Sequence, residues 1–293
     1  MNNKYELKKI NSDNDFQTYI NVTGITGLLE KPQLKQWSSN MAIKYIKDNC
    51  KKESDISCVD ETIIYHPDDK LLESARYAHK QRLNETADIG SELHKLIESF
   101  INIKIDVYND TDIKNTKDIE KKCNNFLNYT NSLDYKTKQM FYQFYIWQRK
   151  NVKRFIASEM TVCHQELCYA GTLDFIYEGL DGKIYCCDLK TSNNIYKEHE
   201  LQCISYKYAR ESMEGSYYIK KEYNGQKWQE KKEYNKIKID KCSILNISRD
   251  FFDLDFKVIK DQENLFDAFK GLLIFYYAYA KRQLNNKRAK ERT

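Results

Sequence analysis

Apolar residues in the first half of the chain recur mostly at helical spacing. After Lys31-Pro32, where a proline fits the first turn of a helix, the apolar positions from Leu34 to Tyr45 follow this period. The same spacing predicts three further helices, at 71–82, from residue 88 to about 100, and at 123–155. The chain has only 2 Pro and 9 Gly, so few residues interrupt long helices.

The pattern changes after residue 155, where short runs of apolar residues predict strands. These runs lie at 156–163, 171–177, 184–189 and 244–248. Two more helices are predicted at 198–211 and 261–284, and residues 1–15 and 112–122 look like a polar leader and a polar connection. Tyr19–Leu29 favours a short strand or a loop. We therefore expect a mixed α/β protein, with a helical region over residues 1–155 and a sheet-containing region over 156–293. No flexible Gly/Ser linker separates them, so they should pack as one unit.

Two carboxylates and a lysine stand at the ends of two consecutive predicted strands. Asp174 ends the run that begins at Gly171, and Asp188-Leu189-Lys190 closes the next run, with the tight connection 180–183 between them. Two aspartates suit a hard cation such as Mg²⁺ or Mn²⁺. A lysine two residues beyond Asp188 shares its face of the strand and can hold the attacking water or the scissile phosphate. Surface turn acids would also explain the aspartates, but the lysine spacing favours metal-dependent phosphodiester hydrolysis.

Other polar residues extend this candidate site. His94 and Glu98 share one side of the helix that begins near Gly90, and the His94 imidazole can complete a metal shell. Glu159, in the strand before the hairpin, is a candidate for a ligand or for holding a bound water. Gln202 and Tyr206 share one face of the following helix, where they either contact a phosphate or lysine and a base, or form part of an ordinary amphipathic face.

Composition narrows the class of protein. The net charge of +5 is compatible with nucleic-acid binding, and a basic tail over 281–292 is either a frayed terminus or a phosphate contact. The 9 Cys are scattered without a CxxC pair, which indicates a reduced protein with no local zinc or Fe–S signature.

Met1–Ile10 is polar, so we expect no signal peptide, and the apolar run Leu272–Ala280 is too short to span a bilayer. We expect a cytoplasmic protein without membrane contact. The many Asn, Lys, Ile and Tyr codons are AT-rich, which suggests a low-GC bacterium or a virus-infected cell.

Taken in order, these motifs resemble the RecB-type exonuclease branch of the PD-(D/E)XK nuclease superfamily. The resemblance rests on the following residues: Gly90-Ser91, His94, Glu98, Glu159, Gly171-Thr172-Leu173-Asp174, Asp188-Leu189-Lys190-Thr191-Ser192, Gln202 and Tyr206. The segment from Val22-Thr23 to Trp37 also resembles phage-encoded members and the mitochondrial genome maintenance exonuclease. The similarity covers Val22 to about Tyr208, and only the combined motifs are specific. Ser91 stands where the family has Thr, a change that keeps the ability to cap a helix.

The resemblance implies a restriction-endonuclease-like core, a mixed central sheet flanked by helices. It further implies DNA as the substrate, Mg²⁺ or Mn²⁺ as the cofactor, and a role in replication, recombination, repair or phage DNA metabolism, with replication or recombination proteins as possible partners. The implied metal ligands are His94, Asp174, Asp188 and the carbonyl of Leu189, with Lys190 as the catalytic lysine. Some CRISPR-associated relatives carry an Fe–S cluster held by clustered C-terminal cysteines. Here Cys242 is the last cysteine and stands alone, so we expect no such cluster.

Three functions fit these residues. The first is an exonuclease that acts on free DNA ends, with a preference for single strands admitted through an arch formed by the helical region. In that reading, aromatic and basic residues such as Trp147, Arg149 and Lys150 stack on bases and contact phosphates, although most aromatic residues should belong to the core. The second is a structure-specific endonuclease with the same chemistry. The third is a DNA-binding subunit without catalysis, against which the presence of Asp174, Asp188 and Lys190 argues.

Overall fold

The computed structural model describes residues 5–10, 15–29, 32–56, 61–109, 116–223, 226–250 and 253–290. Contacts within the chain divide it into two compact units, one formed by residues 1–29 and 93–293, and the other by residues 30–92. This division differs from the halves expected from the sequence, because the helices between residues 93 and 151 share a unit with the sheet.

The unit of residues 30–92 is formed by helix and a small hairpin. It contains α2 (Pro32–Asn49), the antiparallel strands β3 (Lys51–Ile56) and β4 (Glu61–His66), and the first part of α3 (Asp69–Asn109). The helix start at Pro32 is as predicted. The prediction of two separate helices at 71–82 and after residue 88 is wrong, because α3 runs through Gly90 without a break. A glycine inside a helix costs only about 1 kcal/mol, which a helix of this length can tolerate.

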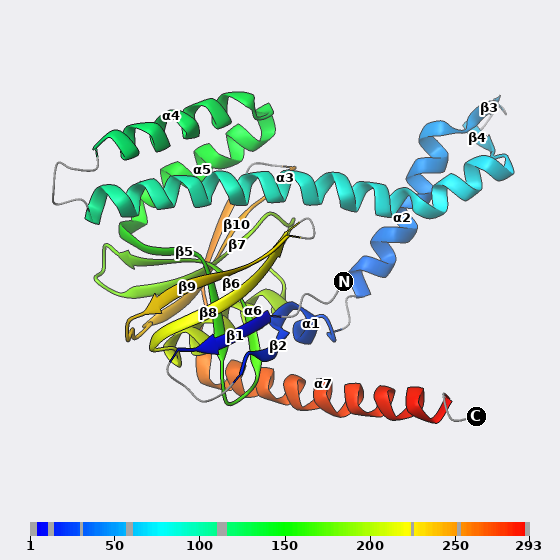
Figure 1. Ribbon diagram of the computed structural model, residues 1–293. Coiled ribbons are helices and arrows are strands. Elements are labelled where there is room, and N and C mark those ends of the chain that lie inside the picture. Colours follow the sequence, from blue (N-terminus) through cyan, green and yellow to red (C-terminus); the bar gives the residue numbers. More distant parts are fainter. Residues whose placement is uncertain are drawn as a thin grey trace. The chain divides into compact units, whose positions relative to one another are not determined.

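The other unit is organised around one open sheet of nine described strands (Figure 1). These strands are β1 (Tyr5–Lys9), β2 (Gln17–Asn21), β5 (Val152–His164), β6 (Tyr169–Gly179), β7 (Ile184–Lys190), β8 (Gly215–Tyr223), β9 (Gln226–Tyr234), β10 (Lys241–Ile247) and β11 (Leu254–Val258). Their order is β11-β10-β7-β6-β2-β1-β8-β9, and β5 pairs with β6 outside this path. β7 runs parallel to β10 and β2 parallel to β6, whereas the other pairs are antiparallel. The expected mixed α/β architecture, with helices flanking a mixed sheet, is therefore confirmed.

Helices pack on both faces of this sheet (Figure 1). They are α1 (Val22–Thr26), α5 (Tyr135–Asn151), α6 (Lys197–Glu211) and α7 (Gln262–Lys290), while α4 (Thr116–Ser132) packs on α3 and α5 through Phe126. Trp147 of α5 packs against Phe175 and Tyr177 of β6, with ring centroids 6.2 and 5.6 Å apart. The strand period turns the alternate residues of β6 toward the opposite face, where Ile176 joins the core that includes Ile204 of α6. The sheet thus buries one layer against α5 and another against α6 and α7.

The strands of the central hairpin agree closely with the sequence prediction. β5, β6, β7 and β10 cover the four predicted apolar runs, and α6 and α7 cover the two predicted helices. The connection between β6 and β7 is a tight turn in which Gly179 N–H donates to the carbonyl of Lys183 at 2.9 Å. Gly182 has φ of 74°, a left-handed conformation that favours glycine. The turn fixes the register that brings the ends of β6 and β7 together.

Other predictions need correction. The supposed polar leader contains β1, which pairs with β2 and β8 and buries Leu7 completely. The strands β8 and β9 were not predicted, because segments such as QKWQEKKEY are strongly charged and largely exposed. The connection at 112–122 already contains the start of α4 at Thr116, and residues 112–115 lie outside the described residues. The side chains of the basic tail over 281–292 also lie outside them, so its role stays a prediction.

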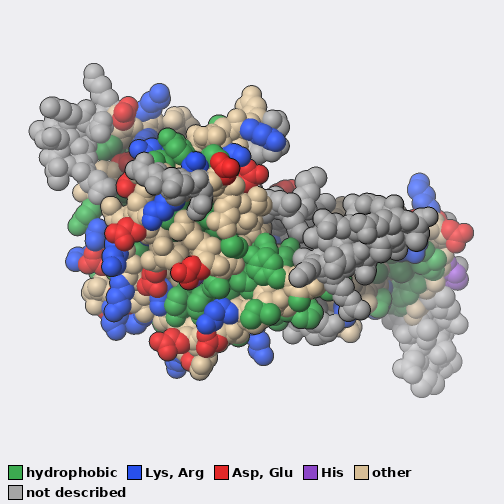
Figure 2. Space-filling model, turned by 60° about the horizontal axis from the view of Figure 1, so that its bottom comes forward, with side chains coloured by type: hydrophobic (Ala, Val, Ile, Leu, Met, Phe, Trp, Pro, Cys, Tyr) green, Lys and Arg blue, Asp and Glu red, His purple; other side chains and the backbone are tan. Residues whose placement is uncertain are grey.

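Several cysteines are buried near the centre of the sheet. Cys186 and Cys187 are buried in β7, as expected, and Cys242 lies near Cys203 rather than apart, with its Sγ 3.8 Å from the Cys203 carbonyl oxygen. None of the described helices combines the length and apolar character needed to cross a membrane. Figure 2 shows hydrophobic side chains gathered on the face that carries α7, where Ile274 and Phe275 are among the most exposed.

One expected result concerns the N-terminus of α5. The Asp134 carboxylate accepts hydrogen bonds from the N–H groups of Lys136 and Thr137 and from the Thr137 hydroxyl. These bonds lower the pKa of Asp134, so they stabilise the folded protein above the ordinary aspartate pKa and are lost as pH falls through the lowered value. Asp134→Ala should lower the free energy of unfolding by about 1 kcal/mol at pH 7 in urea titrations, and by less near pH 3. Asp134→Asn, which keeps the cap but not the charge, should lose less stability than Asp134→Ala at pH 7, and an equal loss in both variants would contradict this role.

Candidate metal centre

The site forms where β6 and β7 separate at the open end of their hairpin. Phe175 pairs with Cys187, and one step further the same register sets Asp174 opposite Asp188. There the regular ladder ends, because the Oδ2 atom of Asp174 accepts the Leu189 N–H at 2.6 Å in place of a backbone carbonyl. The two predicted aspartates are thus neighbours, but only Asp188 lies near the end of its strand, whereas Asp174 lies in the middle of β6, where its pairing with β7 stops.

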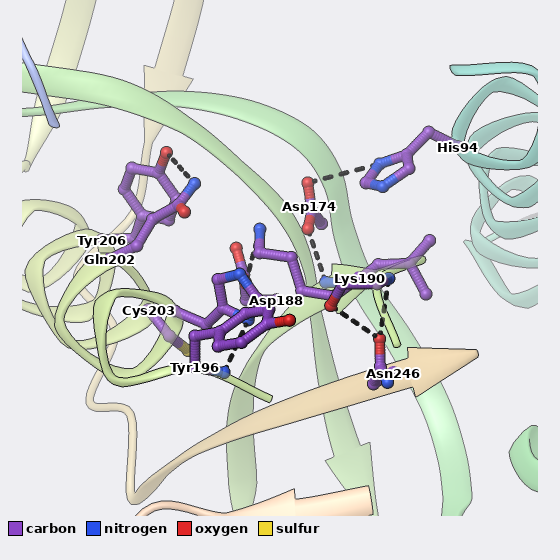
Figure 3. A network of polar contacts seen from close by, with 12 residues as sticks. His94, Asp174, Asp188, Lys190, Tyr196, Gln202, Cys203, Tyr206 and Asn246 are labelled. Carbon is purple, nitrogen blue, oxygen red and sulfur yellow. Dashed lines mark hydrogen bonds and ion pairs between the residues drawn. The ribbon is translucent and has the colours of Figure 1, made fainter. Parts of the chain in front are cut away.

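Asp188 and Lys190 form a buried ion pair on one face of β7. The Lys190 Nζ lies 2.7 Å from Oδ2 of Asp188, and the side chains are 19% and 1% exposed (Figure 3). Burial raises the pKa of Asp188 above its ordinary value. Burial alone would lower the pKa of Lys190, but the charges of Asp188 and Asp174 outweigh it and raise that pKa. Lys190 is therefore an ammonium at neutral pH. The Oδ1 atom of Asp188 is buried and accepts no hydrogen bond from any described residue, so it can accept a further ligand.

His94 brings an imidazole to the same place from α3. Its Nδ1 atom lies 3.6 Å from Oδ1 of Asp174 (Figure 3) and 3.8 Å from Oε1 of Glu159. Burial alone would lower the pKa of His94, but the Asp174 charge and the Glu159 carboxylate raise it above the ordinary histidine value. One ligand atom from each of His94, Glu159 and Asp174 lies within 4.8 Å of the others.

Glu159 reaches this group through an unusual backbone conformation. Ser158 pairs with Phe175 and Met160 with Leu173, so Glu159 lies across from Asp174 in the β5–β6 ladder. Its φ is 45°, in the left-handed region that non-glycine residues rarely adopt. Such strain persists where the surrounding structure imposes it, and it is most common at functional sites. The sequence ranked Glu159 below the two aspartates, whereas the structure brings it directly into the cluster.

Glu98 lies one helical turn beyond His94, on the same side of α3. Burial raises the pKa of Glu98, and the neighbouring Glu159 charge raises it further. Glu98 is therefore electrostatically linked to the cluster without belonging to the group of three close ligand atoms.

Of the two alternatives open for Gln202 and Tyr206, the structure favours the buried face of an amphipathic helix, α6. Tyr206 is 3% exposed, and the Gln202 Nε2 donates to its hydroxyl at 2.9 Å (Figure 3). A methyl group added at Gly171 would lie 2.4 Å from the Tyr206 ring, so the ring packs directly on the backbone of β6. The interpretation that Tyr206 stacks on a base is wrong for this conformation. The same holds for Trp147, which is 5% exposed within the aromatic core.

Asn246 was not predicted from the sequence. It is buried in β10 beside Lys190, and its Oδ1 accepts hydrogen bonds from the backbone N–H and the hydroxyl of Ser192 (Figure 3). These bonds fix the chain just beyond Lys190. A polar residue inside the apolar run Ile244–Ile247 was the available signal.

The donor set suits a divalent cation. Donor atoms around one Mg²⁺ lie at most about 4.2 Å apart, since each is about 2.1 Å from the ion. The three atoms within 4.8 Å would therefore need only small side-chain movements to share an ion. Carboxylate oxygens favour Mg²⁺ and Mn²⁺, and an imidazole nitrogen shifts the preference toward Mn²⁺ and other transition metals. Asp188 and the Leu189 carbonyl remain predicted ligands. The Leu189 N–H donates to Asp174 and holds its carboxylate in place.

Searches for related proteins give no assignment. No protein-family model matches the sequence, and no curated protein matches it significantly.

Proposed function

We propose that the chain is a metal-dependent deoxyribonuclease that hydrolyses phosphodiester bonds. One observation carries the proposal: ligand atoms of His94, Glu159 and Asp174 converge within 4.8 Å, next to the Asp188–Lys190 ion pair. A histidine, three carboxylates and a protonated lysine at the end of one hairpin provide both a cation site and a positive group for a phosphate.

The arrangement of the strands supports the same conclusion. β5, β6 and β7 form an antiparallel meander, and β10 pairs parallel to β7 after a connection that contains α6 and the hairpin β8–β9. This order agrees with the mixed sheet that the PD-(D/E)XK resemblance implies. We therefore propose that the hairpin and its neighbours form a restriction-endonuclease-like core.

The roles of the residues follow from their contacts. Asp174, Glu159 and His94 would hold a divalent cation, which when bound supplies Lewis-acid chemistry at the scissile phosphate. Lys190, kept positive by Asp188 and Asp174, is suited to donate to the attacking water or to a phosphate oxygen and is poorly suited to accept a proton. Leu189 and Asn246 hold the two strand ends that carry these groups. Glu98 adds negative charge near Glu159.

The proposed activity is exonucleolytic, from free DNA ends and with a preference for single strands. In Mn²⁺ buffer, a labelled linear single strand should be degraded, while the same sequence ligated into a circle stays intact. An Asp188→Asn preparation, purified in parallel, controls for contaminating nucleases.

Other outcomes of the experiment with linear and circular strands would support other functions. Equal degradation of circle and linear strand would contradict the exonuclease proposal and support the endonuclease alternative. Binding of both forms without cleavage would support a DNA-binding subunit, and neither binding nor cleavage would point to a duplex or RNA substrate.

A further inference from the structure

A second polar cavity lies away from the metal centre, within the same unit. Its volume is about 750 Å³, and α3, α5 and the start of β5 line it. Four cations are among its lining residues: Lys104, Arg149, Lys153 and Arg154. Basic residues brought together from three separate elements indicate a site for a polyanion.

The local ion pairs leave this cavity positively charged. Lys153 and Arg154 share the single carboxylate of Glu178, with N–O distances of 2.6 Å. Lys104 and Arg149 are exposed and form no ion pair with a described residue. Four cations against one carboxylate leave an excess of three positive charges for a ligand.

Aromatic residues stand beside the cations. Tyr108 is 57% exposed, and the Arg154 guanidinium lies 5.4 Å from its ring centroid. Tyr145 also lines the cavity. An exposed tyrosine offers a flat surface on which an unpaired base can stack, whereas paired bases in a duplex present no free face. Cations with an exposed ring therefore favour single-stranded nucleic acid over a simple phosphate.

The distance between the cavity and the metal centre can be estimated along α3 and along β5, because each of these elements contributes residues to both sites. Along α3, Lys104 lies ten residues beyond His94, which is about 15 Å at 1.5 Å per residue. Along β5, Arg154 lies five residues before Glu159, which is about 16 Å at roughly 3.3 Å per residue. The two estimates agree. At a rise of about 3.4 Å per nucleotide, the gap corresponds to four or five nucleotides, and to fewer in a stretched strand.

We propose that this cavity is a binding subsite for the single strand whose phosphodiester bond lies at the metal centre, about four nucleotides away. This inference rests on the proposed nuclease function. Lys104 and Arg149 contact phosphates, and Tyr108 stacks on a base.

The test measures binding without cleavage, so it does not depend on the metal centre. Fluorescence anisotropy with a labelled 12-nucleotide oligothymidylate in EDTA, over a salt series, compares wild type with Lys104→Ala/Arg149→Ala. Loss of two phosphate contacts should reduce the magnitude of the log–log salt slope by about 1.4. Affinity at low salt should fall at least tenfold. The matched control, Lys183→Ala/Lys238→Ala, removes the same charge from exposed residues outside the cavity and should change neither quantity.

Tyr108→Ala separates stacking from charge. Removing one stacked base contact should weaken oligothymidylate binding by roughly tenfold, while Tyr108→Phe should bind like wild type. An abasic strand of equal length should not respond to Tyr108→Ala but should still respond to Lys104→Ala/Arg149→Ala.

Equal effects of the cavity and control double variants would overturn the subsite, as would failure of wild type to bind the strand. The proposed subsite would also be overturned if Lys104→Ala/Arg149→Ala weakened the binding of duplex DNA only. A nuclease-inactive protein that gives the expected binding results would refute the proposed activity and leave the subsite standing.

Discussion

Asp188→Asn is expected to lower the rate of DNA cleavage by about a thousandfold while the protein stays folded. The side chain keeps its shape but loses the charge that pairs with Lys190 at 2.7 Å, and one of the two buried carboxylate oxygens becomes an NH2 group that cannot bind a cation. Loss of charge stabilisation at a metal centre costs several kcal/mol, and each 1.4 kcal/mol is about tenfold in rate. The matched control is Asp181→Asn, a largely exposed acid in the turn of the same hairpin, which should cleave like wild type.

A double-variant cycle shows how Asp188 acts. If Asp188 works by holding Lys190, then Lys190→Met should slow cleavage about as much, and the double variant should be little slower than either. If Asp188 instead binds the cation, Asp188→Asn should also weaken Mn²⁺ binding, and the two effects should add. Wild-type cleavage by a folded Asp188→Asn protein would refute the assignment of the site.

The second large effect concerns the metal. His94→Ala and Asp174→Asn should each weaken Mn²⁺ binding by at least about tenfold, measured by titration calorimetry or by the free Mn²⁺ signal in electron paramagnetic resonance, without any substrate. His94→Ala removes one of three donors within 4.8 Å, and Asp174→Asn removes the negative charge of another. Cleavage should fall in parallel. Because His94 supplies nitrogen, Mn²⁺ should support cleavage at least as well as Mg²⁺, and this preference should weaken in His94→Asp.

The pH dependence of metal binding has a defined sign. A proton on the His94 imidazole competes with the cation, and the neighbouring carboxylates raise the pKa of His94 above its ordinary value. Mn²⁺ affinity should therefore be full at high pH and begin to fall, as pH decreases, above the ordinary histidine pKa. An Mn²⁺ affinity that does not change between pH 8 and pH 5.5 would count against His94 as a ligand. Cleavage that is supported by Mg²⁺ but not by Mn²⁺ would count against it as well.

Local sequence patterns were sufficient to predict contacts between residues that lie close together in the sequence. Asp174, Asp188 and Lys190 lie on two strands joined by a four-residue turn, and strand alternation sets Asp188 and Lys190 on one face. The apolar runs in β6, β7 and β10 were readable because each of these strands buries most of its residues, and the run in β5 was readable although fewer of its residues are buried. Charged strands such as β9 lack this signal, and pairing with β8 is what makes them strands.

Contacts between distant segments were decided only by the tertiary structure. The convergence of His94 and Glu159 on Asp174 depends on how α3 packs and on the β5–β6 register, which no local pattern encodes. The sequence correctly predicted that Gln202 and Tyr206 are neighbours on one face of a helix. It could not predict that this face packs against β6 instead of facing solvent, because that depends on the space that Gly171 leaves for the Tyr206 ring. Apart from Asn246, the residues of the site could thus be identified from the sequence. Which of them touch depends on long-range packing, because burial and register are properties of the whole sheet.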